Sequence, residues 1–336
     1  MKLAVVGAGY WGINLVRIFH RLGVLAKICD FSAARLTQLS ADYPDVPVEG
    51  SWQAVMADRS LDAVVIATPA ETHYELAKQG LLADKDVMVE KPMTLRCEET
   101  EDLIEIAESR RRILMVGHLL EYHPAVTRLK SLVEQGELGR IEYIYSNRLN
   151  LGKVRREENA FWSFAPHDIS VILLLLNQLP IQVTATGGTY LQPNIADVTV
   201  STMLFNRGVR AHVFVSWLHP YKEQKLVVVG ERRMAVFDDV RKTEKLQMFD
   251  KHIEMVNGQF VVERPTPEAV SFDADEPLML ECRHFMECVD SRRTPKTDGH
   301  DAWRVLRVME ASQRSLSMNG EPVQLEAHRS LELVRA

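Results

Sequence analysis

The feature that most constrains this chain is the glycine-rich segment GAGYWG at residues 7–12. It follows the apolar run Leu3–Val6 and opens the amphipathic segment Trp11–Leu22. Gly7, Gly9 and Gly12 allow a tight turn, close approach of a pyrophosphate to the backbone, and close packing of a helix on a strand. The N-terminus of that helix presents partial positive charge to the phosphates. The segment therefore predicts a strand–turn–helix unit that binds a dinucleotide, with Tyr10 and Trp11 beside it.

An acidic residue, Asp30, follows the second apolar segment, Leu25–Cys29, where dinucleotide-binding folds place a carboxylate for the ribose. Such a carboxylate accepts hydrogen bonds from the adenosine ribose hydroxyls and repels a 2′-phosphate. We therefore expect NAD as the cofactor. Arg35 lies nearby in the sequence, and its positive charge keeps NADP open as the alternative.

Short apolar runs alternate with helix-length amphipathic segments over residues 1–120. Runs this short, apolar throughout and separated by helices, are typical of a doubly wound parallel sheet. We predict strands at Leu3–Val6, Leu25–Cys29, Ala63–Ala67, Val87–Val89 and Leu114–Val116, and helices at Trp11–Leu22, Ala33–Tyr43, Tyr74–Ala83 and Cys97–Arg111. Residues 1–120 are thus expected to form an α/β Rossmann domain that binds NAD.

After Tyr122 the pattern changes to long segments that alternate between apolar and polar residues, which indicates a largely antiparallel sheet. Strands are expected at Gln182–Tyr190, Ala196–Phe205, Val209–Trp217, Lys225–Gly230 and Met234–Phe237, and helices at Pro124–Glu134, Asp168–Asn177, Pro277–Val289 and His300–Met318. Residues 121–336 are therefore predicted to be an α+β domain with one broad, open sheet, the substrate-binding and oligomerisation domain of the family resemblance given below.

The composition excludes several classes of protein. With 336 residues, 46% of them hydrophobic and 26% charged, the chain has the composition of a globular protein and not of a disordered or collagen-like one. Its net charge of −6 argues against general affinity for nucleic acid or anionic membranes. No apolar run approaches the roughly 20 residues that cross a bilayer. We expect a cytoplasmic protein.

The cysteines Cys29, Cys97, Cys282 and Cys288 form neither a CxxC pair nor a pattern of metal-ligand spacing. They are expected to be reduced, packed thiols, and no metal site is predicted.

The segment Glu90-Lys91-Pro92 follows the apolar strand Val87–Val89. Ligands of open α/β sheets bind at the carboxyl ends of the strands, so Lys91 is expected beside the cofactor. A partly desolvated lysine next to a cationic nicotinamide should have a depressed pKa and can stabilise a developing alkoxide. The bond before Pro92 is a candidate for the cis form. The alternative is a surface lysine at the end of a strand.

Polar residues follow two other predicted strands at the same edge. Thr68, Pro69 and His73 come after Ala63–Ala67 and could line the cofactor, or could be turn residues only. His118 comes after Leu114–Val116 and could line the site or merely end the strand.

The predicted second domain contains one histidine of interest, His167, between Pro166 and Asp168. Proline and aspartate suit the start of a helix, which would place His167 in the first turn of Asp168–Asn177. A helix N-terminus disfavours the imidazolium, so this histidine would stay neutral and could accept a proton. A purely structural histidine is the alternative.

Four cations and two asparagines are concentrated in the segment 147–156, which includes Arg148, Asn150 and Lys153. In an anionic chain such a segment could bind a diphosphate and hydrogen-bond a sugar. It could equally be a solvated basic surface.

Taken together, GAGYWG, Asp30, ATPAETH, VEKP and PHD resemble, in their order and spacing, the Gfo/Idh/MocA oxidoreductases over nearly the whole chain. The stretches VGHLLEYHPAV, SNRLNLGKVRREENAFWSFAPHDISVI, TATGGTYLQPNIADVT and FVSWLHPYKEQKLVVVG are similar to a sugar-nucleotide branch, the UDP-N-acetylglucosamine 3-dehydrogenases. Those enzymes oxidise the sugar C3 hydroxyl to a ketone that is later transaminated. The resemblance implies that Lys91 is the catalytic lysine and His167 the active-site histidine. Ser163 departs from it, because inositol-dehydrogenase-like members usually carry an aspartate at that position.

The resemblance implies an NAD-dependent dehydrogenase of a UDP-amino sugar in lipopolysaccharide or lipid A biosynthesis. It also implies a cytoplasmic homo-oligomer, dimer or tetramer, that supplies an aminotransferase. Two alternatives stay open: a dehydrogenase of a free polyol such as inositol, and a dinucleotide-binding sensor without turnover. The expected cofactor contacts are Gly7, Gly9, Tyr10, Trp11, Gly12, Asp30, Thr68, Pro69, His73, Glu90 and Lys91. The expected substrate contacts are His118, Arg148, Asn150, Lys153, Ser163 and His167.

Overall fold

The computed structural model describes residues 1–325, which form two compact units. The first unit comprises Met1–Tyr122 and Asp275–Leu306, and the second comprises His123–Ala274 and the chain from Arg307 on. The chain leaves the first unit close to the predicted boundary at residue 120. The predicted second domain, residues 121–336, is however interrupted, because Asp275–Leu306 returns to the first unit. Among the described residues, no helix combines the length and apolar character needed to cross a membrane.

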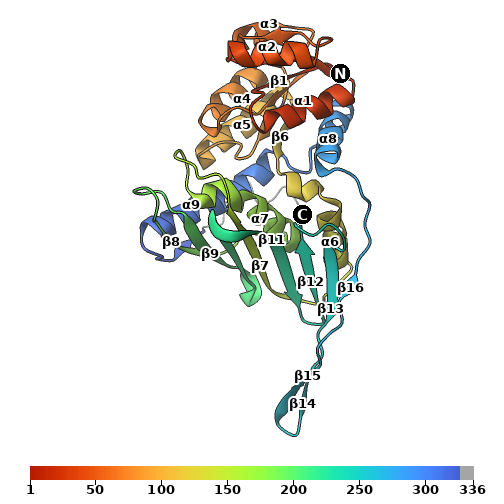
Figure 1. Cartoon of the computed structure of the whole chain (residues 1–336), viewed down its shortest axis with the longest axis vertical. Helices are drawn as coiled ribbons and strands as arrows, with labels where there is room; N and C mark the ends of the chain where they lie inside the picture. The colour runs from red at the N-terminus through yellow and green to blue at the C-terminus, as the bar shows by residue number, and fades with distance from the viewer. Residues whose placement is uncertain (326–336) are drawn as a thin grey trace. The chain divides into compact units, whose positions relative to one another are not determined.

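The first unit contains a six-stranded parallel sheet in the order β3-β2-β1-β4-β5-β6 (Figure 1). Its strands are β1 (Leu3–Val6), β2 (Leu25–Cys29), β3 (Val48–Glu49), β4 (Ala63–Ile66), β5 (Asp86–Glu90) and β6 (Leu114–Gly117). The strand order reverses direction between β1 and β4, and open sheets bind ligands outside the strand ends at such a point. The predicted doubly wound sheet is confirmed.

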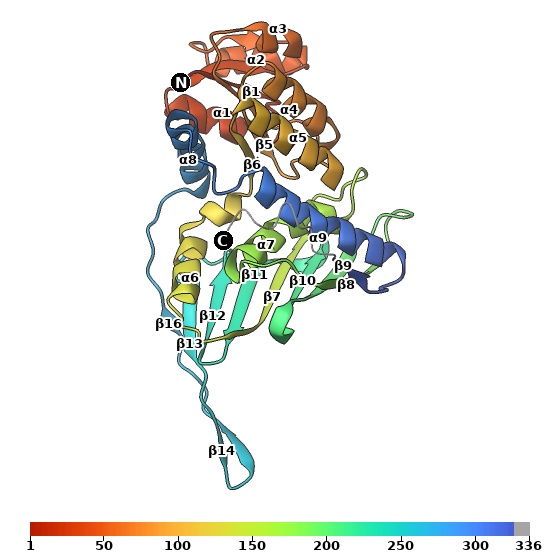
Figure 2. The same cartoon turned by 180° about the vertical axis from the view of Figure 1, so that it is seen from behind.

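Helices cover both faces of this sheet (Figures 1 and 2). They are α1 (Gly12–Arg21), α2 (Ala33–Asp42), α3 (Trp52–Ala57), α4 (His73–Leu82), α5 (Cys97–Arg110), α8 (Pro277–Ser291) and the start of α9 (Gly299–Ser317), with short 3-10 turns η1 (Ala70–Thr72) and η2 (Leu119–Tyr122). Leu3 and Val5 of β1 pack with α1 and α8, whereas Ala4 and Val6 pack with α4 and α5. Because both faces are buried, β1 is continuously apolar and does not alternate.

Two elements of the first unit, β3 and α3, were not predicted. A strand of two residues and a helix of six are too short to show a periodic pattern. Ser51 caps α3, its hydroxyl accepting a hydrogen bond from the Ala54 N–H at 3.3 Å.

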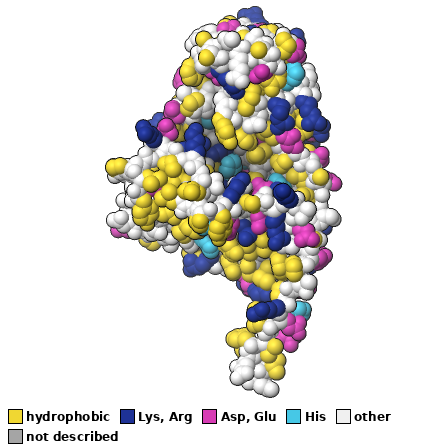
Figure 3. All heavy atoms as spheres, viewed as in Figure 1, with side chains coloured by type: hydrophobic (Ala, Val, Ile, Leu, Met, Phe, Trp, Pro, Cys, Tyr) yellow, Lys and Arg dark blue, Asp and Glu magenta, His cyan; other side chains and the backbone are white. Residues whose placement is uncertain are grey.

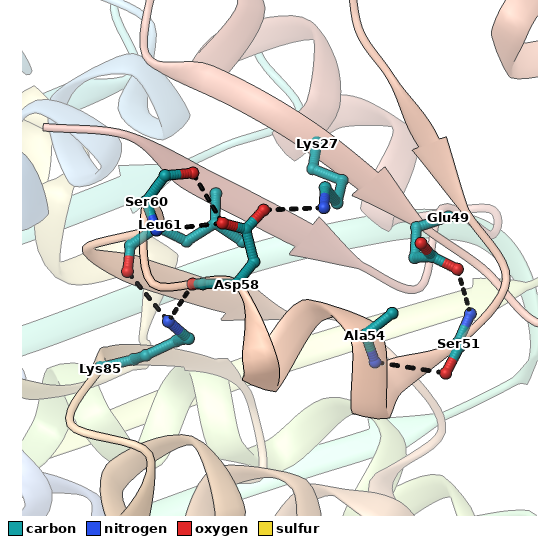
Figure 4. A network of polar contacts seen from close by, with 8 residues as sticks. All are labelled: Lys27, Glu49, Ser51, Ala54, Asp58, Ser60, Leu61 and Lys85. Carbon is teal, nitrogen blue, oxygen red and sulfur yellow. Dashed lines mark hydrogen bonds and ion pairs between the residues drawn. The ribbon is translucent and has the colours of Figure 1, made fainter.

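A polar network holds the loop after α3 (Figure 4). The Lys27 ammonium lies 2.8 Å from Asp58 Oδ2 and lowers the pKa of that carboxyl. The buried Lys85 ammonium donates to the carbonyl oxygens of Asp58 at 2.8 Å and Leu61 at 3.0 Å. Burial lowers the pKa of Lys85. The network ties the loop to β2 and to the start of β5.

The second unit is built on a nine-stranded sheet in the order β16-β13-β12-β11-β7-β10-β9-β8-β17. Only the β7–β10 pair is parallel among these described strands. The bounds are β7 (Ile141–Leu151), β8 (Gln182–Gly188), β9 (Val198–Leu204), β10 (Arg210–Ser216), β11 (Leu218–Gly230), β12 (Arg233–Asp238), β13 (Leu246–Asp250), β16 (Glu268–Ala269) and β17 (Val323–Gln324). The broad, largely antiparallel sheet is confirmed.

A separate hairpin, β14 (Ile253–Val256) and β15 (Gln259–Val262), extends away from the nine-stranded sheet (Figures 1 and 2). Cross-strand pairs Ile253–Val262 and Met255–Phe260 make one of its faces wholly apolar. All four side chains are exposed, and hydrophobic side chains are visible along the hairpin in Figure 3.

The helices of the second unit are α6 (Pro124–Glu134), α7 (Ala160–Leu176), the 3-10 turn η3 (Asn206–Gly208) and the rest of α9. The prediction for α7 was wrong at its start. The helix begins after Asn159, whose side chain accepts from the Trp162 N–H at 3.1 Å, and Pro166 lies inside it. Burial of nearly every residue of α7 stabilises the helix despite the backbone hydrogen bond that Pro166 cannot make. His167 therefore lies in the middle of α7 and not in its first turn. The expectation that the helix N-terminus keeps its imidazole neutral does not apply.

No strand was predicted for the basic segment, but its first half belongs to one. β7 runs to Leu151, so only the residues from Gly152 onward leave the sheet. Arg148, on β7, is buried and paired with Asp168 of α7, with Nε 2.7 Å from Oδ2 and Nη2 3.2 Å from Oδ1. The Ser146 hydroxyl donates to the same carboxylate at 2.6 Å. The pair fixes α7 on the sheet.

Loss of one partner of this buried pair should be costly, because the other charge is left uncompensated. We expect Arg148→Met to lower the free energy of unfolding by about 3–5 kcal/mol in urea denaturation. Arg156→Met, at an exposed position of the same segment, should change it by less than about 0.5 kcal/mol. Equal stability of the two variants would show that the pair is not structural.

Candidate active site

The turn at residues 7–12 requires glycine at two positions for steric reasons. Gly7 has φ +84°, and a Cβ there would lie 2.8 Å from the Ala67 carbonyl and the Thr68 nitrogen. A Cβ at Gly12 would lie 1.9 Å from the Gly7 oxygen. At Gly9, by contrast, a Cβ would meet nothing within 4 Å. Gly7 and Gly12 thus close the turn, and Gly9 is the position where a ligand can approach the backbone.

A pocket of about 610 Å³ opens at this turn. It is lined by Gly9, Tyr10, Trp11, Ile13, Asn14 and Arg35. Tyr10 is 93% exposed, so its ring stands free of the protein core. The pocket lies at the start of α1, where backbone N–H groups and the helix dipole favour the pyrophosphate of a dinucleotide.

Asp30 lies where the ribose carboxylate was predicted, at the end of β2. Its Oδ2 accepts from the Ala8 N–H at 2.9 Å and its Oδ1 from the Ser32 N–H at 2.9 Å. The Arg35 Nε–H donates to the Ala8 carbonyl at 2.7 Å. Asp30 and Arg35, the two residues expected to decide between NAD and NADP, are therefore both hydrogen-bonded to Ala8 of the turn.

Glu90 connects the turn to the end of β5. The Trp11 indole N–H donates to its Oε1, and the Lys91 N–H donates to its Oε2 at 3.3 Å. A Cβ at Gly117 would lie 3.2 Å from the Glu90 carboxylate, so the missing side chain there makes room for it. Burial raises the pKa of Glu90 to about 7, against the lowering effects of the Trp11 hydrogen bond and the Lys91 charge.

Glu281 on α8 is a further carboxyl of this region that the sequence analysis missed. It is fully buried, and among the described residues neither of its oxygens has a hydrogen-bond partner. Burial, and then the neighbouring Glu90, raise its pKa well above the usual range. In the sequence, the only indication that this glutamate is buried was its place beside Cys282 on the apolar face of a helix.

His73 links the loops that follow β4 and β5. Its Nδ1 lies 2.7 Å from the Pro92 carbonyl oxygen and its Nε2 2.8 Å from the Thr68 carbonyl oxygen. Burial lowers its pKa. The Lys91–Pro92 bond is cis, as considered from the sequence. Carbonyl oxygens only accept, so the neutral ring donates to one of the two and is in contact with the other. His73 thus lies between the two loops, the Thr68 hydroxyl is bonded to that of Thr72 at 2.7 Å, and Pro69 is exposed.

His118, directly after β6, is buried and lies against a carboxylate, Asp301, from the start of α9. Asp301 was not predicted to belong to the site. The two residues are 183 positions apart, and no local pattern connects them.

The substrate candidates of the second unit fall into different environments. His167 is partly buried on α7, and Ser163, one turn earlier, accepts a hydrogen bond from Arg155 Nε at 3.1 Å. Lys153 and Arg156 are exposed, whereas Arg148 is held by Asp168. Of the predicted cations, Lys153 and Arg156 are the ones available to a ligand, because Arg155 is held by Ser163 and Glu158.

Comparison with known proteins matches residues 1–118 to the oxidoreductase family with an NAD-binding Rossmann fold, and residues 126–236 to the GFO/IDH/MocA C-terminal domain. A UDP-N-acetylglucosamine 3-dehydrogenase of Acidithiobacillus ferrooxidans is 27% identical over 312 residues, covering 91% of this chain and 94% of that protein. The scyllo-inositol 2-dehydrogenase (NAD⁺) of Bacillus subtilis is 26% identical, covering 82% and 81%.

Solved structures agree with this fold. The structure of the Acidithiobacillus 3-dehydrogenase has a TM-score of 0.84 with 26% identity, covering 95% of this chain and 98% of that one. GenD2 from gentamicin A biosynthesis, solved in complex with NAD, has a TM-score of 0.83 with 22% identity, covering 97% of each chain. The second likeness shows the fold alone.

The parallel sheet, the glycine turn and the ribose carboxylate define an NAD-binding oxidoreductase of the Rossmann type. More particularly, the chain belongs to the Gfo/Idh/MocA family, and its first unit carries that family's NAD-binding Rossmann fold.

We expect Asp30→Ala to weaken NAD binding by at least tenfold and NADP binding by much less. The carboxylate pairs with ribose hydroxyls but repels a 2′-phosphate. Fluorescence titration with NADH and NADPH measures both affinities, and Thr37→Ala, at an exposed position of α2, is the control. Equal loss for the two cofactors would remove Asp30 from cofactor selection.

The pKa of Glu90 predicts a pH-dependent signal from Trp11. Above about pH 7 the carboxylate is ionised and accepts a charge-assisted hydrogen bond from the indole, and below it the protonated acid accepts a weaker one. Tryptophan emission should therefore change with a midpoint near pH 7. The change should vanish in Glu90→Gln and in Trp11→Phe; its persistence in either variant would assign it to other groups.

Proposed function

We propose that this protein oxidises the C3 hydroxyl of UDP-N-acetylglucosamine, or of a closely related UDP-amino sugar, to the 3-keto sugar with NAD. The observation that carries the reaction is the position of Lys91, the first residue after β5 at the carboxyl edge of the cofactor-binding sheet. The similarity to a UDP-N-acetylglucosamine 3-dehydrogenase over nearly the whole length of both chains supports the substrate.

Lys91 is assigned to the hydroxyl oxygen of the sugar. An ammonium there holds the oxygen and stabilises the negative charge that develops as the proton leaves. NAD, when held at the glycine turn, would supply the acceptor for the hydride from the carbon that carries this hydroxyl. Glu90 and the Lys91 backbone are joined by a hydrogen bond, so the lysine leaves the sheet from a fixed position.

His167 is assigned as the proton acceptor. It lies in the interior of α7, a helix fixed by the buried Arg148–Asp168 pair. The neighbouring Asp168 is occupied by Arg148 and Ser146, and Ser163 stands where related enzymes carry a carboxylate. The imidazole of His167 is therefore the base that this helix offers.

The exposed cations Lys153 and Arg156 are assigned to the diphosphate, with Asn150 as a hydrogen-bonding partner for the sugar. Arg148 is not assigned to the diphosphate, because Asp168 compensates its charge within the protein. Asn150 lies close to the chain at Gly152, where a Cβ would come within 2.6 Å of its amide nitrogen. A 3-keto product of this reaction is a substrate for a later aminotransferase.

A dehydrogenase of a free polyol is the second candidate, favoured by the similarity to scyllo-inositol 2-dehydrogenase over four fifths of each chain. The exposed cations after Gly152 favour a phosphorylated substrate instead.

A panel of UDP-sugars and free polyols with NAD and NADP tests the proposal through absorbance at 340 nm. We expect turnover with UDP-N-acetylglucosamine and NAD, and at least a 100-fold lower kcat for Lys91→Met with unchanged NAD affinity. Lys2→Met, an exposed lysine of the same unit, is the control. Turnover with inositol alone would establish the polyol reading, and none with any sugar would indicate a sensor.

The basic segment makes a separate prediction. A charge-assisted contact to the diphosphate contributes roughly 1.5–3 kcal/mol, so Lys153→Ala or Arg156→Ala should raise KM for the UDP-sugar about 10- to 100-fold. The diphosphate is bound alike in ground and transition states, so kcat should change little. Arg207→Ala, on η3, serves as the control. Unchanged KM in both variants would leave the segment as a solvated surface.

A further inference from the structure

A buried histidine–carboxylate pair lies at the end of β6, within the first unit. His118 and Asp301 are 2% and 3% exposed, and His118 Nδ1 is 2.8 Å from Asp301 Oδ2. A second carboxylate oxygen, Oε1 of Glu121, lies 3.9 Å from the same nitrogen. The short contact is thus with Asp301, at hydrogen-bonding distance.

The chemistry of this contact selects one form of the imidazole. An ionised carboxylate only accepts hydrogen bonds, so the proton of His118 lies on Nδ1. Nε2, on the far side of the ring, is then the nitrogen left for a ligand. Where a carboxylate orients a catalytic or ligand-binding histidine, one ring nitrogen likewise donates to the carboxylate and the other binds the ligand.

The backbone holds Asp301 in place for this role. The Asp301 N–H donates to Asp298 Oδ1 at 2.9 Å, within the first turn of α9. The residue before α9, Asp298, forms a bridge with Met115 of β6. The start of α9 is therefore joined to the strand that carries His118, and the carboxylate and ring approach each other from two fixed elements.

The register of the sheet places His118 beside the lysine of the proposed reaction. Glu90 of β5 pairs with Gly117 of β6, so Lys91 and His118 are the next residues on two neighbouring parallel strands. Both leave the sheet at its carboxyl edge, where ligands of such sheets bind.

We propose that Asp301 is a positioning residue for the reaction at Lys91. It holds His118 with Nδ1 protonated and the ring in one orientation, so that Nε2 accepts a hydrogen bond from a hydroxyl of the bound sugar. This inference rests on the proposed sugar dehydrogenation. It also gives the site a carboxylate-oriented imidazole in the first unit, whereas Ser163 leaves the corresponding position of α7 without a carboxylate.

The wild-type protein provides the first test, independent of turnover. With ¹⁵N-labelled histidine, the His118 resonances, assigned by comparison with His118→Gln, should show a protonated Nδ1 and an unprotonated Nε2. Asp301→Asn should replace this state by a mixture of tautomers. A wild-type ring protonated on Nε2 alone, or a tautomer that Asp301→Asn leaves unchanged, overturns the proposal even if no sugar is turned over.

Kinetics provides the second test. Asp301→Asn should lower kcat for the sugar at least tenfold, with NAD affinity and KM within about twofold. Asp290→Asn, the same change at an exposed position of α8, is the matched control and should keep kcat within about twofold.

The double variant decides whether Asp301 acts through the histidine. If it does, His118→Gln/Asp301→Asn should be no slower than His118→Gln alone. Additive losses, or a normal kcat in Asp301→Asn, overturn the positioning role. Absence of turnover in the wild type with every sugar contradicts the proposed function, and the nitrogen resonances then decide the role of Asp301.

Discussion

The close approach of Gly12 to the Gly7 carbonyl is the constraint on which the first unit depends. With 1.9 Å available at the position of a Cβ, no other residue can follow this turn into α1. The turn then becomes the common anchor of three elements. Asp30, directly after β2, and Arg35 of α2 bind Ala8, and Trp11 binds Glu90 of β5. The cofactor pocket therefore depends on the backbone geometry of this turn and on the side chains that bind to it.

Much of this arrangement could be predicted from sequence, because it is local. Each predicted feature lies within a few residues of the sequence pattern that predicts it. This holds for the strand–turn–helix unit, the ribose carboxylate and the lysine after β5. The start of α7 was misplaced because Pro166 is a strong start signal, and burial of the surrounding helix outweighed it. The strand β7 was not predicted, because the buried Arg148 and the cations that follow it look in sequence like surface residues.

The two acidic residues of the site that could not be predicted depend on contacts between distant segments. Asp275–Leu306 returns to the first unit and brings Glu281 and Asp301 to the ends of β5 and β6. In sequence both are acidic residues of amphipathic helices, indistinguishable from solvent-exposed neighbours. Their burial, and so their chemistry, arises only when α8 covers one face of the sheet and α9 begins beside β6.

The burial that the covering of the sheet produces also determines how the cysteines react with oxidants. All four cysteines are buried and none forms a disulfide. Burial raises the pKa of Cys29 and of Cys288 to about 11, and that of Cys282 well above its usual range. The thiolate is the form that peroxides and alkylating reagents attack, and these sulfurs hold almost none of it near neutral pH. While the chain is folded, these thiols therefore react little with oxidants. They become sensitive to oxidation when unfolding exposes them.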